Sequence, residues 1–424
     1  MRIAVVGLGH IGLPLAVQYA SRGHEVVGCD VDERIVAAIG RGESPHLDER
    51  ALVERVPDLV RARRLRATTD DAEGVRGAET VVVIVPVVVD AAREIDFGPI
   101  DAATRELARG LSPGTLVIYE TTLPVGTTRD RFGPMLAAGS GLTLDSDLWL
   151  AFSPERVLVG RVLADLTRYP KIVGGTSEES TRRAMAFYRA VLEPETEVWP
   201  VANAETAELA KLAETTYRDV NIAYANELAR YAARRGIDVS EVIRAANSQP
   251  YSHIHQPGVG VGGHCIPVYP HFLFNADPEL RLPPLAREIN ESMAAFTVDM
   301  VEDRIGSLDG QPVLVLGVAY RADVREDAFS SAFRLRDELT AAGARVFAHD
   351  PYFDAEHLRA VGFEPYDLAA PAAVRVAILQ APHAAYAELP PERLPGLELF
   401  VDGRNAMDRA RFEGAGIGYV GIGR

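Results

Sequence analysis

The chain has 424 residues, 47% of them hydrophobic, and a formal net charge of −16. This length predicts two or three domains, and the negative charge argues against nucleic acid or an anionic membrane surface as a general partner. No apolar run reaches the roughly 20 residues that cross a bilayer, and the N-terminus lacks a cleavable signal pattern. The chain has only two cysteines, Cys29 and Cys265, which indicates a reducing cytoplasm and no disulfides.

The chain opens with a strand, a glycine-rich turn, a helix, a second strand and an acid. Residues 2–6 predict a buried strand, residues 12–22 a helix, and residues 25–28 a strand that ends near Asp30. The turn between the first strand and the helix is formed by Gly7, Gly9, His10, Ile11 and Gly12. This order of elements is typical of a dinucleotide-binding fold.

Each position of this motif has a physical reason. Gly7 permits the tight turn, Gly9 lets a pyrophosphate approach the helix N-terminus, and Gly12 lets the helix pack closely on the strand. Asp30 is placed to accept hydrogen bonds from an adenosine ribose, which favours NAD over NADP. The alternative is a tight turn with a solvated aspartate.

Three further strands are predicted at residues 80–85, 115–120 and 148–152, and polar clusters follow the second and the third. Thr122 comes after the second of them, and Glu155 with Arg156 after the third. Ligands of a parallel sheet lie at the carboxyl ends of its strands, so these side chains are candidates for a site. Turn chemistry and helix capping for the threonines, and a surface ion pair for Glu155 and Arg156, are the alternatives.

Residues 203–235 contain no proline or glycine and predict one long helix, capped by Asn203 and stopped by Gly236. Such a helix spans about 45 Å at about 1.5 Å per residue, which favours a scaffold between domains with a dimer face. Lys211, Thr215 and Arg218 share one side of it, at positions i, i+4 and i+7. A solvated charged stripe is the commoner explanation for such residues.

Cys265 lies in a loop of unusual composition. Four glycines stand at residues 258–263, just before the thiol, and prolines follow it. Glycines let a backbone approach a ligand closely, so the loop suggests that the thiol is used. The alternative is the buried, inert cysteine that most lone intracellular cysteines are.

The last third of the chain predicts a second doubly wound unit without the glycine motif. Its strands are expected at residues 312–316, 345–348, 374–379 and 398–402, with a helix over 330–342. Arg321 follows the first of these strands, again at a carboxyl end. We therefore expect an α/β chain: a Rossmann domain over residues 1–200, a helical middle domain over 201–305 and a Rossmann-like domain over 306–424.

An NAD site combined with a cysteine has a chemical logic. NAD takes hydride from an alcohol to give an aldehyde, the thiolate adds to the aldehyde, and the adduct loses a second hydride to a second NAD. The resulting thioester is hydrolysed to a carboxylate. A neighbouring cation or base helps because free cysteine is only a few per cent thiolate at pH 7. Lys211 is the candidate for acid–base or oxyanion work, and Thr122 and Glu155 for water and proton handling.

The motifs together resemble those of the nucleotide-sugar 6-dehydrogenases, the UDP-glucose/GDP-mannose dehydrogenase family, over essentially the whole chain. The matching stretches are residues 7–16, 120–128, 153–156, Lys211 with 217–222, 262–267, 317–321 and 401–405. The resemblance implies NAD-dependent, four-electron oxidation of C6 of a nucleotide-linked sugar to a uronic acid. It also implies Cys265 as nucleophile, Lys211 as the acid–base or stabilising lysine, a C-terminal nucleotide-binding domain and a homodimer built on the long helix.

The Gly262-Gly-His-Cys265 version of the loop is most similar to the branch that acts on UDP-N-acetylhexosamines, whereas UDP-glucose and GDP-mannose enzymes usually show Gly-Gly-Ser-Cys. The cofactor-binding candidates are the five residues of the glycine turn with Asp30 and Thr122. The candidate substrate-binding residues are Glu155, Arg156, Lys211, Thr215, Arg218, Tyr251, Gly262, Tyr269 and Arg321.

The chain departs from the family pattern around the predicted pocket. Tyr269 stands where the family has an aspartate four residues after the thiol, and Thr215 stands where it has asparagine. Tyr251 takes the place of an arginine that reaches substrate, and the stretch after Arg321 lacks the usual Arg-Glu-Ser-Pro. Either the substrate is altered with the chemistry kept, or the chain is a catalytically weakened nucleotide-sugar-binding protein.

A metal-dependent hydrolase is the competing class. Histidines and the thiol cluster at His253, His255, His264, Cys265 and His271. Zinc takes such ligands, but these spacings match no standard zinc pattern, and the glycine motif near the N-terminus would go unexplained. We therefore expect no metal site.

Overall fold

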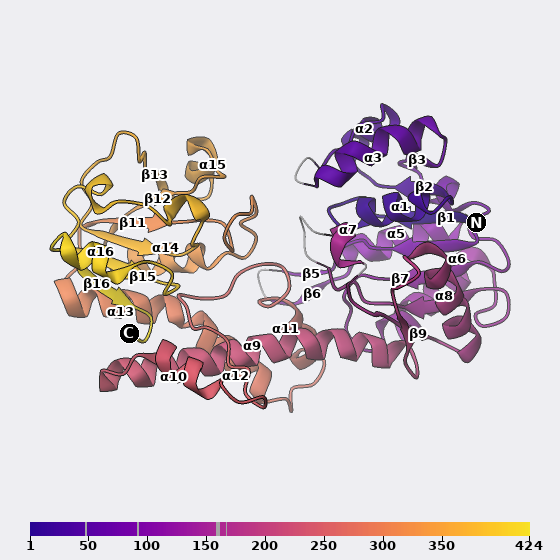
Figure 1. Cartoon of the computed structure of the whole chain (residues 1–424). Helices are drawn as coiled ribbons and strands as arrows, with labels where there is room; N and C mark the ends of the chain where they lie inside the picture. The colour runs from indigo at the N-terminus through magenta and orange to yellow at the C-terminus, as the bar shows by residue number, and fades with distance from the viewer. Residues whose placement is uncertain (47–48, 91–92, 158–161, 167) are drawn as a thin grey trace. The chain divides into compact units, whose positions relative to one another are not determined.

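The computed structural model describes residues 1–46, 49–90, 93–157, 162–166 and 168–424 (Figure 1). The chain divides into two units, residues 1–213 with 271–276 and residues 214–270 with 277–424. Each unit holds a largely parallel sheet with helices on both faces, which confirms the expected α/β class with two doubly wound sheets. No helix in the described part of the chain is long and apolar enough to cross a membrane.

The first unit is built on an eight-stranded sheet in the order β10-β9-β8-β7-β4-β1-β2-β3. Neighbouring strands run parallel except β8 and β9, which are antiparallel. The strands are β1 Arg2–Val6, β2 Glu25–Cys29, β3 Leu65–Thr68, β4 Thr80–Val83, β7 Leu116–Tyr119, β8 Trp149–Phe152, β9 Lys171–Gly175 and β10 Val198–Pro200. A separate antiparallel pair joins β5 (Val88–Val89) to β6 (Ile95–Asp96).

Alternate residues of these apolar strands point to opposite faces, so helices cover both. Ile3 and Val5 of β1 pack in one core with residues of helices α1 (Gly12–Ser21), α3 (Arg50–Arg61) and α8 (Glu178–Val191). On the other face Tyr119 stacks on Phe132 and bonds Thr104 of α5 (Gly98–Ala108). The remaining helices of this part are α2 Glu33–Gly40, α4 Asp71–Val75, the π-helix η1 Thr127–Phe132, α6 Gly133–Ser140 and α7 Val162–Asp165.

The long helix is present as α9, Ala204–Arg235. The predicted caps are confirmed: the Asn203 side chain accepts the N–H of Thr206 at 2.9 Å, and Gly236 takes a left-handed φ of +64°. An alanine face of α9 packs against α10 (Val239–Ala246) and α13 (Met293–Ile305). The other helices here are α11 Tyr269–Phe274 and α12 Leu282–Glu291.

The second unit contains a six-stranded, all-parallel sheet in the order β13-β12-β11-β14-β15-β16. The strands are β11 Pro312–Leu316, β12 Arg345–His349, β13 Glu364–Pro365, β14 Val376–Leu379, β15 Leu399–Asp402 and β16 Gly418–Gly421. Val313 and Val315 face a core shared with α13 and α14 (Ser331–Ala341), while Leu314 and Leu316 face Phe412 of α16 (Arg409–Gly414). The short helices are α15 Ala355–Ala360, η2 Ala384–Tyr386 and η3 Pro391–Arg393.

Candidate active site

The glycine turn between β1 and α1 fits a dinucleotide. Gly7 has a φ of +95°, and a Cβ on Gly12 would lie 1.8 Å from the Gly7 carbonyl oxygen, so the chain itself requires both glycines. A Cβ on Gly9 would meet no protein atom within 4 Å. The side of Gly9 is therefore open to a ligand, as a site for a pyrophosphate requires.

Asp30 is held at this turn. Its Oδ2 accepts the Leu8 N–H at 2.7 Å and its Oδ1 accepts the Asp32 N–H at 2.9 Å. A carboxylate has about four acceptor positions, so this one still has capacity for ribose hydroxyls. Because both oxygens of Asp30 are held by backbone N–H groups, the alternative of a freely solvated aspartate is disfavoured.

His10 and Ile11 lie in the glycine turn. His10 has a partner, His46, that the sequence did not predict. The His10 ring packs on the ring of His46, with 4.4 Å between centroids. The Nε2 of His46 lies 2.8 Å from the Leu8 carbonyl oxygen. A histidine 36 positions further along the chain therefore supports the cofactor turn.

The threonine-rich segment after β7 is anchored by a buried acid. Glu208 of α9 accepts the N–H of Gly126 at 2.6 Å and both the N–H and the hydroxyl of Thr128, at 2.9 and 2.6 Å. Burial raises the pKa of Glu208 to about 7, against the hydrogen bonds from Thr128 and Gly126, which lower it. The anchor fixes the segment that follows the buried Thr122 to α9, one helical turn before Lys211.

Glu155 belongs to a buried ionic cluster. The ammonium of Lys171 lies 2.8 Å from Oε2 of Glu155 and 2.8 Å from Oε2 of Glu120. The Tyr188 hydroxyl donates to Glu120 at 2.6 Å. Glu155 is thus paired with a buried lysine rather than with Arg156, whose backbone N–H donates to Glu155 Oε1 and whose guanidinium bonds the Pro170 carbonyl oxygen.

The cluster shifts the titration of its members. Burial raises the pKa of Glu120 to about 7, although Lys171 acts to lower it. Burial alone would raise the pKa of Glu155, but the charge and hydrogen bond of Lys171 bring it below the usual value. Burial alone would lower the pKa of Lys171, and the two carboxylates reverse this, so the pKa rises. Glu155 is therefore held ionised.

The three predicted side chains on α9 are not a solvated stripe. Lys211 and Thr215 are buried, at 6% and 0% exposure, and Arg218 is half-buried. The Nε of Arg218 is buried and has no hydrogen-bond partner among the residues that the structure describes. A partly buried guanidinium with a spare donor is a suitable group for binding an anion.

The thiol loop lies in the second unit, with Cys265 half-buried. The N–H of Tyr269 donates to the Cys265 carbonyl oxygen at 2.9 Å, so the two residues are one turn apart at the start of α11. The loop is tied to the second sheet by three contacts. The N–H of Val259 bonds the Gly403 oxygen, the N–H of Gly263 bonds the Ala328 oxygen, and Arg404 donates to the Gly260 oxygen at 2.9 Å.

The glycines of this loop are needed by the protein itself. A Cβ on Gly262 would lie 2.9 Å from the Phe329 oxygen and 3.0 Å from Tyr320 Cβ, and one on Gly260 would lie 2.7 Å from Ser331 Cβ. From the sequence, these glycines predict close approach of a ligand to the backbone. In the structure the segment of residues 320–331 approaches the loop instead, and this segment carries Arg321.

Two predicted residues lie at the surface or near it. The Tyr251 side chain is 93% exposed. Arg321 is half-buried, and its Nε donates to the Tyr320 hydroxyl at 3.0 Å. The second unit thus places Gly262, Cys265 and Tyr269 in a loop that packs on the segment of Arg321. The first unit holds the glycine turn with Asp30, and it also contains Thr122, Glu155, Arg156 and Lys211.

The histidine cluster shows no metal-binding arrangement. Among residues with a described position, no group of three or more His, Cys, Asp or Glu is placed to hold a metal ion. The hypothesis of a metal-dependent hydrolase does not explain the glycine turn, and this turn has the geometry of a dinucleotide site.

Three models of one family match the chain in succession. The UDP-glucose/GDP-mannose dehydrogenase family's NAD binding domain matches residues 1–192, its central domain residues 205–292 and its UDP binding domain residues 314–409. The first of these confirms the predicted cofactor, NAD.

Curated relatives and solved structures are similar over most of the chain. The UDP-N-acetyl-D-mannosamine dehydrogenase of Pyrococcus horikoshii is 36% identical over 84% of this chain and 85% of its own. That of Salmonella typhimurium is 41% identical over 71% of both chains.

The solved UDP-D-ManNAc dehydrogenase of P. horikoshii superposes with a TM-score of 0.88 at 31% identity, covering 100% of this chain and 99% of that one. An NDP-N-acetyl-D-galactosaminuronic acid dehydrogenase of Methanosarcina mazei gives a TM-score of 0.87 at 31% identity, covering 100% and 95%. These solved structures therefore match the fold of this chain over its whole length. The resemblance and the oxidoreductase class are confirmed: the chain belongs to the UDP-glucose/GDP-mannose dehydrogenase family.

Proposed function

We propose that this protein oxidises C6 of a UDP-N-acetylhexosamine to the uronic acid, with two NAD per sugar. The observation that carries the proposal is the packing of the thiol loop on residues 320–331, within the segment matched by the UDP binding domain. One unit thereby presents both the nucleotide-binding segment and the thiol. The similarity to UDP-N-acetyl-D-mannosamine dehydrogenases supports this class of sugar.

The proposed reaction consists of two oxidations and one hydrolysis. NAD, when bound, accepts a hydride from C6 in each oxidation. Cys265 adds through Sγ to the aldehyde carbon, and the thiohemiacetal loses its C6 hydrogen as hydride to leave a thioester. Water then cleaves the C–S bond and releases the carboxylate and the thiol. Lys211 takes or stabilises the proton and charge on the C6 oxygen, and Thr122 and Glu155 order water.

Tyr269 affects the hydrolysis of the thioester, because it stands where the family has an aspartate. A phenol has a pKa of about 10, so it is neutral near pH 7 and cannot take a proton as a carboxylate does. Glu155 is ionised, but Lys171 and the Arg156 N–H already occupy it. We expect thioester hydrolysis to be slow, or to depend on a water molecule held by Glu155 and Lys211.

The test is an NADH yield measured with UDP-GlcNAc, UDP-ManNAc, UDP-glucose, UDP-galactose and GDP-mannose. Two NADH per acetylated sugar support the full reaction, and one means that the reaction stops at the aldehyde. Preference for UDP-glucose points to the alternative of a UDP-glucose-type enzyme. Binding without NADH across the panel points to a catalytically weakened binding protein.

A homodimer through α9 belongs to this proposal. Tyr217, Tyr224 and Tyr231 follow one another at intervals of seven and are 55%, 51% and 52% exposed. Seven residues are close to two helical turns, so the three rings lie near one line along the helix. Exposed tyrosines in a row are suited to an interface, where such rings bury large areas at low entropic cost. A second copy of the same helix is the occupant that we propose.

Replacing Tyr224 by glutamate places a charge in the middle of that row. We expect the dimer dissociation constant to rise by about tenfold or more, since hot-spot aromatics near an interface centre are worth at least about 1.4 kcal/mol. Sedimentation velocity at several concentrations measures it. Tyr251→Glu, at an exposed tyrosine outside α9, is the control. Identical sedimentation of wild type and Tyr224→Glu at every concentration would remove this face from the proposal.

We also propose the three-domain division at residues 1–200, 201–305 and 306–424, and the cytoplasm as the place of action. The order of the three family segments supports the first. Two free thiols, at Cys29 and Cys265, agree with a reducing compartment and support the second.

A further inference from the structure

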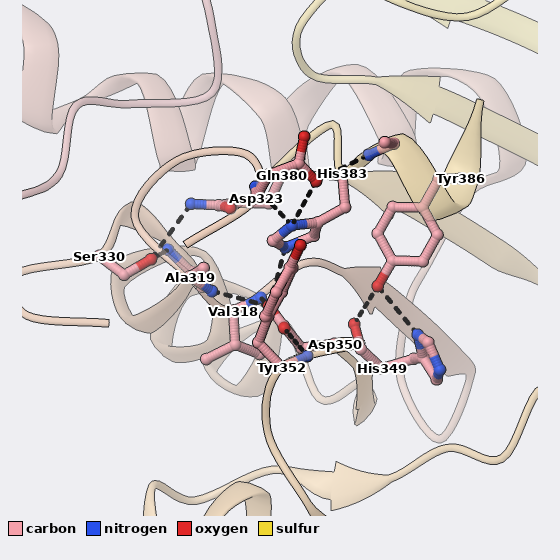
Figure 2. Close-up of polar contacts among 12 residues, drawn as sticks. Val318, Ala319, Asp323, Ser330, His349, Asp350, Tyr352, Gln380, His383 and Tyr386 are labelled. Carbon is pink, nitrogen blue, oxygen red and sulfur yellow. Dashed lines mark hydrogen bonds and ion pairs between the residues drawn. The ribbon is translucent and has the colours of Figure 1, made fainter. Parts of the chain in front are cut away.

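A cluster of polar side chains closes the carboxyl edge of the second sheet (Figure 2). Asp350 follows β12, and its Oδ2 accepts the N–H groups of Val318 and Ala319 at 2.7 and 2.9 Å. Oδ1 accepts the Tyr352 N–H at 2.8 Å. His383, which is 1% exposed, adds its Nε2 at 3.0 Å from Oδ2. Asp350 therefore has partners within the protein on both oxygens.

The same arrangement occurs in the first unit, with one difference. Asp30 follows β2, and its carboxylate accepts the N–H of Leu8 and of Asp32, just as Asp350 accepts those of Val318 and Tyr352. Both sheets have the strand order 3-2-1-4 in their own sequence numbering, as β3-β2-β1-β4 and β13-β12-β11-β14. The two acids are thus structural counterparts.

The difference lies in the segment that follows β4 in the first unit and β14 in the second. After β4 the chain reads Ile84-Val-Pro-Val87, and after β14 it reads Gln380-Ala-Pro-His383. The proline is at the same position in both, and His383 stands where the first unit has Val87. The acid is open to a ribose in the first unit, whereas the second unit closes it with this histidine. Burial alone would raise the pKa of Asp350, but the hydrogen bond from His383 and the backbone bonds keep it below the usual value.

The other ring nitrogen of His383 holds a loop. Its Nδ1 lies 2.9 Å from the backbone nitrogen of Asp323, whose N–H donates to it. Because Nδ1 accepts, the ring proton is on Nε2, which donates to Asp350. A second bond runs the other way, from the Ala384 N–H to Asp323 Oδ1 at 3.0 Å. Asp323 has a left-handed φ of +57°, a conformation that needs such support in a residue other than glycine.

The segment held in this way carries the candidate nucleotide-binding arginine. Arg321 precedes Asp323 by two residues, and Tyr320 packs on Gly262 and Gly263 of the thiol loop. Loss of the ring would leave the Asp323 N–H and one side of Asp350 without their partners. The turn that presents Arg321 would then lose its fixed conformation.

We propose that His383 is a positioning residue for substrate: its ring bridges Asp350 and the backbone of Asp323, and this bridge fixes the turn that presents Arg321 to the nucleotide. The inference rests on the proposed function, because it assigns Arg321 to binding of the UDP-sugar. His383 itself touches neither sugar nor cofactor in this account and acts through residues 320–323.

Calorimetric titration of UDP-GlcNAc into wild type, His383→Ala, His383→Gln, Arg321→Ala and the double variant tests the bridge. We expect His383→Ala to raise the dissociation constant by about tenfold or more, since a lost buried hydrogen-bond pair costs about 1.4 kcal/mol or more. His383→Gln should stay within about threefold of wild type, because an amide accepts with its oxygen and donates with its nitrogen. In turnover, KM for the UDP-sugar should rise while kcat and KM for NAD stay unchanged.

The double variant separates positioning from general destabilisation. If His383 acts through Arg321, adding His383→Ala to Arg321→Ala should raise the dissociation constant little further. Tyr366→Phe is the matched control, because it removes a part-buried hydrogen bond to the Ala372 oxygen in the same unit and leaves the bonds of His383 to Asp350 and Asp323 in place. Its UDP-GlcNAc affinity should equal that of wild type.

The outcomes distinguish two failures. Unchanged affinity in a folded His383→Ala protein, an equal loss in Tyr366→Phe, or full additivity with Arg321→Ala would overturn the bridge while leaving the proposed function intact. If His383→Ala does not fold, His383→Gln decides in its place, because a large loss in that variant contradicts rescue by the amide. A wild type that binds no UDP-sugar at all overturns the proposed function and the inference together.

Discussion

Replacing Cys265 by alanine is expected to abolish formation of the uronic acid. The first oxidation needs no thiol, whereas the second passes through a bond between Sγ and the C6 carbon. Loss of a catalytic nucleophile costs factors of about 10³ or more, so acid formation should fall by at least about 10³-fold. Counting NADH per sugar and identifying the product by mass spectrometry measures this. Acid formed at the wild-type rate would refute the covalent role.

Cys29 supplies the matched control. It is 0% exposed at the end of β2, and burial raises the pKa of its thiol well above the usual value, so it is not a nucleophile. Cys29→Ala should keep the wild-type NADH yield. A thiol reagent that inactivates wild type should also inactivate Cys29→Ala, because Cys265 is the half-buried thiol. The contrast assigns the chemistry to one of two cysteines without relying on family membership.

Local signals in the sequence predicted the fold well. The caps of α9 at Asn203 and Gly236 were read from residue type alone, because an asparagine oxygen and a glycine φ act within a few residues of where they stand. The strands predicted from short apolar runs are present, whereas β3, β5, β6, β9, β10, β13 and β16 were not predicted. Several strand ends differ by one or two residues: β4 stops at Val83, β14 begins at Val376, and β7 stops at Tyr119, where Glu120 turns into the buried cluster.

The supporting residues of the site were missed because their partners are distant in sequence. Glu208 resembles any helical glutamate until Thr128, 80 positions away, is folded against it. Lys171 and Glu120 are 51 positions apart, and His383 and Asp350 are 33. No periodicity marks such pairs. The only local hint was a charged or polar residue at the edge of an apolar run, which a surface position explains equally well.

The thiol loop shows a different limit. A cluster of glycines indicates close approach of some atom to the backbone, but the sequence does not say which atom. Tyr320, Phe329 and Ser331 are the neighbours found. The glycines are therefore explained by the packing of the thiol loop against the segment of Arg321. Their presence alone is not evidence of contact with substrate.

Replacing Lys171 by methionine is expected to destabilise the first unit strongly. Methionine fills similar space but leaves two buried carboxylates, Glu120 and Glu155, facing each other without the cation between them. Removing one partner of a buried ion pair costs about 3–5 kcal/mol. Thermal unfolding of wild type and variant measures the loss. Arg66→Met, which removes an exposed pair with Glu73 at 2.9 Å, is the control and should cost under about 1 kcal/mol.

The pH dependence of that loss gives a sharper test. In wild type the pKa of Glu120 is raised to about 7 from a usual 4.5, so the folded state holds a proton that the unfolded state has released between these values. The contribution of Glu120 to stability therefore falls as pH rises from about 4.5 to 7. Without Lys171 the proton is held more strongly, since Lys171 is the group that lowers this pKa. The melting temperature of Lys171→Met should approach that of wild type near pH 5 and fall furthest below it near pH 8. A gap that is constant from pH 5 to 8 would mean that the lysine contributes packing alone, and that Glu155 is held in place without the charge of Lys171.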